Sequence, residues 1–138
     1  MKFNKIKPKF KKYSLPKIGL IALASDYMIE RDFQSVLKNK KIDLFVNRIE
    51  CFNPLTRKNL VKMSKNITTV TNDILPGEKV DCVAYACTSG TIAEGYNYVK
   101  KKLLNAKTKL KINNTKHIIN HCAKKIQNKK SYICMHLK

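Results

Sequence analysis

The chain has 138 residues, enough for one domain with its own hydrophobic core. Hydrophobic residues make up 43% of it, an ordinary share for a globular protein, so the composition excludes a wholly disordered chain. The formal net charge of +20 is concentrated at the two ends. Residues 18–99 hold ten basic and nine acidic side chains, whereas residues 1–17 and 100–138 hold seven and twelve lysines and no acid.

This charge distribution disfavours nucleic-acid binding as the main function. Lys outnumbers Arg 26 to 3, although base readout and bidentate phosphate contacts favour Arg. Only the basic flanks support such binding. No run approaches the roughly 18 apolar residues that a spanning helix needs, and residues 1–17 contain no apolar block of the signal-peptide type. We therefore expect a cytoplasmic protein with no membrane partner.

The cysteines predict neither disulfides nor a metal site. Their number is odd and their spacing is unpaired: Cys51, Cys82, Cys87, Cys122 and Cys134. Without a secretory signal, a disulfide framework is not expected. Two pairs have a spacing that a metal could use, His117/His121 and Cys134/His136. Such pairs in a Lys-rich segment are more often coincidence, so we expect no metal.

The first predicted elements are a strand and a helix. Residues 18–24 form a short apolar run with the length of a buried strand. Ser25 and Asp26 end this run and can cap the element after it. Apolar residues then recur at i, i+4, i+7 and i+8 from Ile29 to Leu37, which places them on one face of a helix.

The alternation of strands and helices continues to residue 87. A second strand is predicted over residues 42–49, and Thr56 in the loop after it is a candidate N-cap. Apolar residues spaced 3-4-3-4 from Leu60 to Ile74 predict one helix of about five turns. Residues 80–87 form a third, mostly apolar strand.

A third helix is predicted to open at Thr91, where Thr91 and Glu94 have the S/T-x-x-E form of a capping box. The resulting β-α-β-α-β-α order predicts an α/β fold, a small parallel sheet with flanking helices. Beyond residue 100 the pattern weakens, and the only elements we expect are one more helix around Ile118–Ile126 and a short strand near 132–135.

These patterns divide the chain into three parts. Residues 1–16 form a basic leader, and residues 17–102 form an α/β half-domain. Residues 103–138 form a Lys/Asn-rich tail that we interpret as truncated or divergent.

A candidate site is predicted by this order of elements, because ligands of open α/β sheets bind beyond the carboxyl ends of the strands, where strand order reverses. If the first strand lies between the other two, Asp26 and the run Cys87-Thr88-Ser89-Gly90 flank that crevice. A helix N-terminus after Cys87 would lower the pKa of its thiol. The hydroxyls of Thr88 and Ser89, with backbone N–H groups around Gly90, can bind a carboxylate or an enolate oxygen. The same residues also fit a small buried cysteine before an ordinary turn.

Four blocks of the sequence resemble the maleate isomerase and ectoine-utilisation group of the aspartate/glutamate racemase superfamily, which also includes arylmalonate decarboxylase. In chain order they are residues 17–33, 53–56 (NPLT), 75–78 (LPGE) and 80–90 (VDCVAYACTSG). The resemblance covers about residues 17–99. It implies a cofactor-independent enzyme that acts on small carboxylates or dicarboxylates and is built from two similar α/β halves in a Rossmann-like, pseudo-symmetric arrangement.

The resemblance also implies roles for the candidate residues. Cys87 is the catalytic thiol of the first half, which adds to the substrate double bond in isomerases or exchanges the α-proton in racemases. Thr88 and Ser89, with Gly90, bind the substrate carboxylate. Asp26 lies where maleate isomerases often have Asn, and an unpaired carboxylate there would repel a dianion.

No second strand–Cys block is found after residue 99, so we expect the chain to be half of such an enzyme and inactive alone. A homodimer or a complementary half-chain would supply the second thiol. The alternatives are a non-catalytic carboxylate-binding remnant and a basic nucleic-acid-associated domain. Of the five cysteines, Cys87 is expected to be the most sensitive to alkylation.

Overall fold

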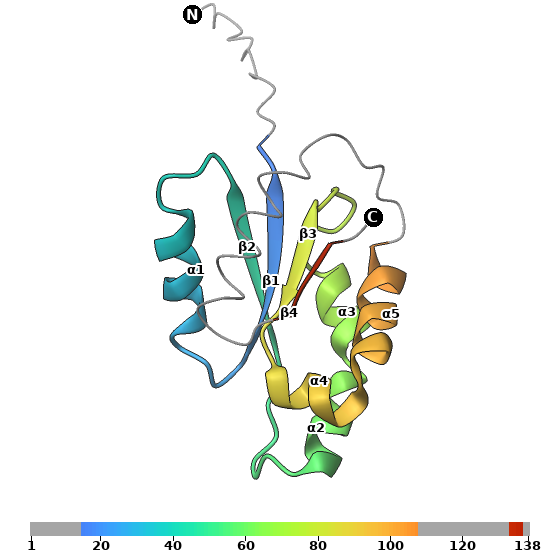
Figure 1. Ribbon diagram of the computed structural model, residues 1–138. Coiled ribbons are helices and arrows are strands. Elements are labelled where there is room, and N and C mark those ends of the chain that lie inside the picture. The colour runs from blue at the N-terminus through green and yellow to red at the C-terminus, as the bar shows by residue number, and fades with distance from the viewer. Residues whose placement is uncertain (1–14, 108–132, 137–138) are drawn as a thin grey trace, which may run out of the picture.

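The computed structural model describes residues 15–107 and 133–136, whose four strands form one sheet in the order β2-β1-β3-β4 (Figure 1). The strands are β1 (Lys17–Leu23), β2 (Asp43–Ile49), β3 (Cys82–Tyr85) and β4 (Ile133–His136). β1 pairs in parallel with both β2 and β3, and β4 pairs antiparallel to β3. The predicted α/β fold with a small parallel sheet is confirmed, and β1 lies between β2 and β3, which is the order on which the candidate site depends.

The carboxyl ends of β1 and β3 lie side by side, because the two strands pair from Ile18↔Cys82 to Ile21↔Tyr85. The N–H of Ala86 donates to the carbonyl of Ile21 at 2.9 Å, which extends the pairing by one residue. The loop after β1 and the turn after β3 therefore start at the same edge of the sheet.

Helices cover both faces of the sheet (Figure 1). They are α1 (Ile29–Leu37), α2 (Arg57–Ser64), α3 (Ile67–Asn72), α4 (Thr88–Glu94) and α5 (Tyr96–Ala106). α1 packs on one face, and α2, α3 and α5 contribute to the core on the other. The sheet thus forms the middle layer of three.

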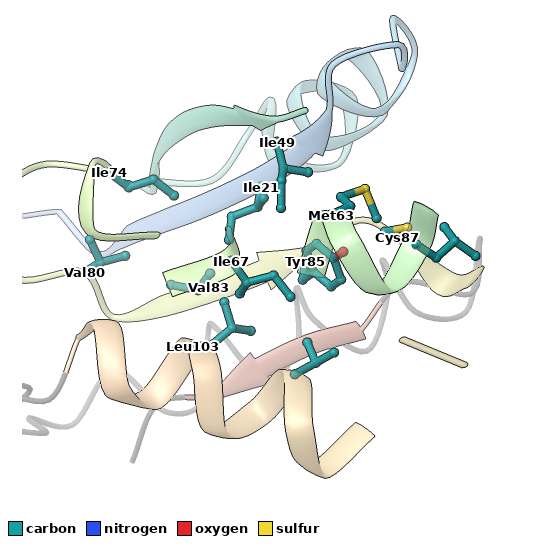
Figure 2. Close-up of a cluster of buried hydrophobic side chains, with 12 residues drawn as sticks. Ile21, Ile49, Met63, Ile67, Ile74, Val80, Val83, Tyr85, Cys87 and Leu103 are labelled. Atoms are coloured by element: carbon teal, nitrogen blue, oxygen red, sulfur yellow. The ribbon is translucent and has the colours of Figure 1, made fainter. Parts of the chain in front are cut away.

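The period-2 alternation of strand side chains divides the core into two clusters. On β1, Ile18 and Leu20 face α1, whereas Ile21 faces the opposite side. On β3, Cys82 faces α1, whereas Tyr85 faces α2, α3 and α5, a cluster that Cys87 also joins (Figure 2). Tyr85 and Cys87, two positions apart, therefore lie on the same face.

The single helix predicted over residues 60–74 is wrong, because α2 ends at Ser64 and α3 begins at Ile67. The N–H groups of Lys65 and Asn66 both donate to the carbonyl of Met63, which closes a tight turn in place of the i→i−4 ladder. Ser64 also bonds to its own helix backbone, a competing interaction that often bends or ends helices. The predicted cap at Thr56 is confirmed, since its Oγ1 accepts the N–H of Asn59 at 3.3 Å.

The predicted capping box at Thr91 is also wrong. α4 begins three residues earlier, at Thr88, with Cys87 as its N-cap. The hydroxyl of Thr91 is buried and donates to the carbonyl of Cys87 at 2.9 Å, so it cannot cap a helix start. Gly95, with φ of 87°, ends α4 and separates it from α5.

The strand expected near residues 132–135 is present as β4. It comes from the segment assigned to the tail, and α5 also runs past the boundary drawn at residue 102. The His117/His121 pair, Cys122 and the further helix expected around Ile118–Ile126 lie outside the described residues, as do residues 1–14.

Candidate functional site

Asp26 lies just after β1 and bonds to the start of α1. Its Oδ1 accepts the backbone N–H of Met28 at 2.9 Å and that of Ile29 at 3.0 Å. Asp26 therefore binds two N–H groups at the start of α1, although the N-cap residue itself is Met28, which makes no side-chain cap. One carboxylate oxygen of Asp26 is occupied within its own loop, at the same sheet edge as the turn after β3.

Arg48 holds the loop that carries Asp26, a role that the sequence did not reveal. Its Nη1 donates to the carbonyl of Asp26 at 2.7 Å and to that of Leu23 at 3.0 Å. Its Nη2 pairs with the carboxylate of Glu30 on α1. One guanidinium from β2 thus fixes the exit of β1 and the first turn of α1.

Cys87 occupies the turn between β3 and α4. Its backbone is extended, with φ −141° and ψ 91°, and its Sγ accepts the N–H of Gly90 at 3.3 Å. Sγ also lies 3.8 Å from the Oγ of Ser89. The Cys87 side chain is only 3% exposed, whereas Thr88 and Ser89 are exposed. The structure therefore brings the thiol and the two hydroxyls onto one turn but buries the thiol beneath it.

Gly90 is the closest neighbour of this thiol on α4. A Cβ atom at Gly90 would lie 2.9 Å from the Sγ of Cys87, 3.0 Å from the hydroxyl oxygen of Tyr85 and 3.1 Å from the Cε of Met63. Contacts this short are repulsive, so a side chain at this position would displace its neighbours. The glycine predicted as a turn residue is needed here for space rather than for its backbone conformation.

The hydroxyl of Tyr85 is the most unusual group beside Cys87. The side chain is 0% exposed, and its oxygen has no hydrogen-bond partner of standard geometry within the described part of the chain. Burial raises the pKa of Tyr85 far above its usual range, and the nearby Cys87 raises this pKa further. Weaker contributions come from Cys51 and Glu94. The hydroxyl therefore keeps its proton throughout the pH range in which thiols ionise.

A second buried polar contact joins α2 to α4 close to this turn. The Oγ of Ser64, which is fully buried, lies 2.6 Å from Oε1 of Glu94 and 2.7 Å from the carbonyl oxygen of Val61. Glu94, predicted as part of a capping box, thus bonds to another helix instead. This contact fixes the far end of α4 relative to the helix that carries Met63.

Two neighbours of the thiol, Tyr85 and Met63, were missed by sequence reasoning. The signal for Tyr85 was present, because residues two apart on a strand share a face and Tyr85 precedes Cys87 by two. Nothing in the local sequence of α2 indicated that Met63 would reach the turn after β3.

Comparisons with models of protein families, with curated proteins and with solved structures found no match. Within residues 15–107, no three His, Cys, Asp or Glu side chains gather in a way that could hold a metal ion. No helix in the same part of the chain has the length and apolarity needed to cross a membrane.

Proposed function

We propose that Cys87 is the reactive thiol of a cofactor-independent, isomerase- or racemase-like site for small carboxylates. The observation that supports this proposal is the fixed position of the sulfur at the end of β3. Its Sγ accepts the Gly90 N–H, with the Ser89 hydroxyl 3.8 Å away and the Thr88 hydroxyl on the adjacent residue. The assignment of carboxylate contacts to Thr88 and Ser89 rests on the family resemblance.

The chemistry available to one thiol is nucleophilic addition. The sulfur of Cys87 would bond to one carbon of an unsaturated dicarboxylate, and the π electrons would move onto the neighbouring carboxylate as an enolate. Hydroxyl donors such as Ser89 stabilise that developing charge. After rotation about the new single bond, the electrons return and expel the thiolate, so that the isomer leaves with no net proton transfer.

Racemase-like chemistry needs a second acid–base group on the opposite side of the substrate. Tyr85 does not meet this need, because its raised pKa keeps the proton on its oxygen and it lies buried on the same side as Cys87. In the proposed function, a second copy of the chain or a complementary half-chain supplies that group.

A second candidate function, carboxylate binding without turnover, is favoured by the burial of Cys87. At 3% exposure the thiol can meet a substrate carbon only if the turn after β3 moves. Binding of a carboxylate by the exposed Thr88 and Ser89 needs no such movement. The two functions therefore differ in whether a bond to sulfur forms.

The test is to incubate the protein with maleate and map any covalent adduct by mass spectrometry. We expect a succinyl adduct at Cys87, in which the sulfur bonds to one alkene carbon and a proton ends on the other. Cys87→Ser should lose the adduct, whereas the matched control Cys82→Ser should retain it. Turnover assays with maleate, aspartate and glutamate, combined with sedimentation, then show whether a dimer completes the reaction.

Two results would count against the proposed catalytic thiol. Protection of the turn by succinate without any adduct would favour the carboxylate-binding function. An adduct at Cys51 but not at Cys87 would move the reactive thiol to the loop after β2.

A further inference from the structure

The Tyr85 hydroxyl is a buried polar group that the proposed function does not use. Its oxygen has no hydrogen-bond partner of standard geometry in the described part of the chain. Leaving such a group unpaired costs stability, and phenylalanine would fill the same space without that cost. The presence of tyrosine rather than phenylalanine at this buried position therefore needs an explanation, and we look for it in the groups around the hydroxyl.

The hydroxyl faces the thiol of Cys87. One point in space, the position that a Cβ of Gly90 would occupy, lies 2.9 Å from the Cys87 Sγ and 3.0 Å from the Tyr85 oxygen. In Figure 2 the Tyr85 oxygen points towards the end of the cluster where Met63 and Cys87 lie. The two groups thus lie on one face of the sheet, and Gly90 places no side chain between them.

We propose that Tyr85 is a positioning residue, whose hydroxyl donates a hydrogen bond to the sulfur of Cys87 when that sulfur is ionised. This inference deepens the proposed function and rests on Cys87 acting as a thiolate. A neutral thiol is a weak acceptor, whereas a thiolate binds a donor strongly. Ionisation of the sulfur therefore strengthens the interaction of the Tyr85 hydroxyl with Cys87.

The charges around Tyr85 support this direction of donation. The titratable groups that act on it are Cys87 on the same strand end, Cys51 after β2 and Glu94 on α4. Each of them is negative when ionised, so each favours the protonated hydroxyl. The raised pKa of Tyr85 keeps the proton on oxygen, and the negative charge stays on sulfur. The thiolate then has two donors, the Tyr85 hydroxyl and the Gly90 N–H.

The test monitors the ionisation of Cys87 in the full-length protein with ¹³Cβ-labelled cysteine, because the Cβ chemical shift reports the thiolate without a reagent that must reach a buried atom. In Tyr85→Phe, we expect the midpoint of the Cys87 titration to move up by about one pH unit, equivalent to roughly tenfold less thiolate below the midpoint. The matched control Tyr98→Phe, which removes the same atom from α5, should leave the midpoint unchanged. The signal that is lost in Cys87→Ser identifies Cys87.

A structural role of Tyr85 would change the unfolding temperature but not this titration. Equal midpoints in the wild type and Tyr85→Phe, or equal shifts in Tyr85→Phe and Tyr98→Phe, overturn the inference. If Tyr85→Phe does not fold, Gly90→Ala decides, because its Cβ would separate the two groups and should raise the midpoint in the same way.

The outcome is independent of carboxylate chemistry. A raised midpoint in Tyr85→Phe together with no maleate adduct on the wild type would leave this inference standing and refute the proposed function. A maleate adduct together with an unchanged midpoint would support the proposed function and refute the inference about Tyr85.

Discussion

Gly90 donates its backbone N–H to the Sγ of Cys87 at 3.3 Å, so the position of the thiol depends on a glycine three residues further along the chain. Glycine inside a helix costs roughly 0.5–1 kcal/mol relative to alanine. At Gly90 the helix backbone approaches its neighbours so closely that a Cβ atom would clash with Cys87, Tyr85 and Met63. The glycine therefore couples the backbone of α4 directly to the sulfur.

A first prediction compares the two buried cysteines of the β3 region. Cys87 and Cys82 are 3% and 0% exposed, so burial alone hardly separates them. We expect iodoacetamide to modify Cys87 at least tenfold faster than Cys82, because Cys87 lies in the turn at the sheet edge with an N–H donor on its sulfur. Peptide mapping after timed quenching measures both rates in one sample. Equal rates would indicate that Cys87 is an inert core residue.

Cys51 is not a suitable reference for this experiment. It is more exposed than the other two and can react faster for that reason alone. The sequence-based expectation that Cys87 is the most sensitive of the five cysteines stays a prediction, and faster labelling of Cys51 would count against it.

A second prediction concerns the stability of Tyr85→Phe. At about pH 6, below the range in which thiols ionise, we expect its free energy of unfolding to exceed that of the wild type by about 1 kcal/mol. The cause is the removal of a buried hydroxyl that has no partner within the described residues. Urea unfolding measures the difference, and a loss of stability would show that the hydroxyl is satisfied in the neutral site.

The wild type and Tyr85→Phe should also differ in how their stability depends on pH around and above the ordinary tyrosine pKa of 10.0. Burial raises the pKa of Tyr85 in the folded state, so above that pH the unfolded chain releases a proton that the folded chain retains. The folded state then binds more protons than the unfolded state, and wild-type stability falls as the pH rises. Tyr85→Phe lacks this contribution, so its stability should fall less between about pH 9 and about pH 11.

A third prediction concerns Lys107, whose Nζ donates to the carbonyls at the end of α3. It lies 2.6 Å from the oxygen of Ile74 and 3.3 Å from that of Asn72. Without the ammonium, these carbonyls at the end of the helix lose a hydrogen-bond donor. Lys107→Met should therefore lower the free energy of unfolding by about 1 kcal/mol. The exposed Lys101→Met on α5 is the matched control and should be neutral. Equal stability of both variants would refute this role.

The pKa of Lys107 is lowered by burial, an effect that nearby Asp73 opposes. Between the lowered value and the ordinary 10.5, the unfolded chain binds more protons than the folded chain. Stability should therefore rise with pH in this window for the wild type, and the rise should be absent in Lys107→Met.

A fourth prediction concerns the basic flanks. Any affinity for duplex DNA should be weak, independent of sequence and steeply dependent on salt. Replacing the lysines of residues 1–14 and 108–132 by glutamine should abolish this affinity for DNA. Substitution is used instead of deletion so that β4 stays in the chain. Fluorescence anisotropy at two salt concentrations measures the effect. Tight binding retained by the substituted chain would point to a groove on the near-neutral part.

Features set by neighbours in sequence were predictable. The buried run of β1, the hydrogen bonds of Asp26 to the start of α1 and the cap at Thr56 depend on residues within a few positions, and the structure has all of them. Local sequence was also enough to predict that Cys87 lies between a strand and a helix, although the helix begins at Thr88 rather than Thr91.

Features set by packing between distant elements were not predictable. The break after Ser64 accompanies its contact with Glu94, thirty residues away. The burial of the Cys87 thiol depends in part on Met63 of α2, which meets it beside Gly90. No periodicity in a single element records contacts of this kind.

The antiparallel pairing of β4 with β3 has a consequence for how the chain is made. Cys82 pairs with His136, so the apolar strand that ends before Cys87 has no partner on this side until more than fifty further residues have been synthesised. An unpaired apolar strand edge on a nascent chain invites aggregation. Between β3 and β4, residues 107–132 carry eight lysines and no acid. Charges of the same sign repel one another and so oppose association between growing chains. The lysine-rich segment is therefore the part of the chain that is synthesised while this strand edge still lacks its partner.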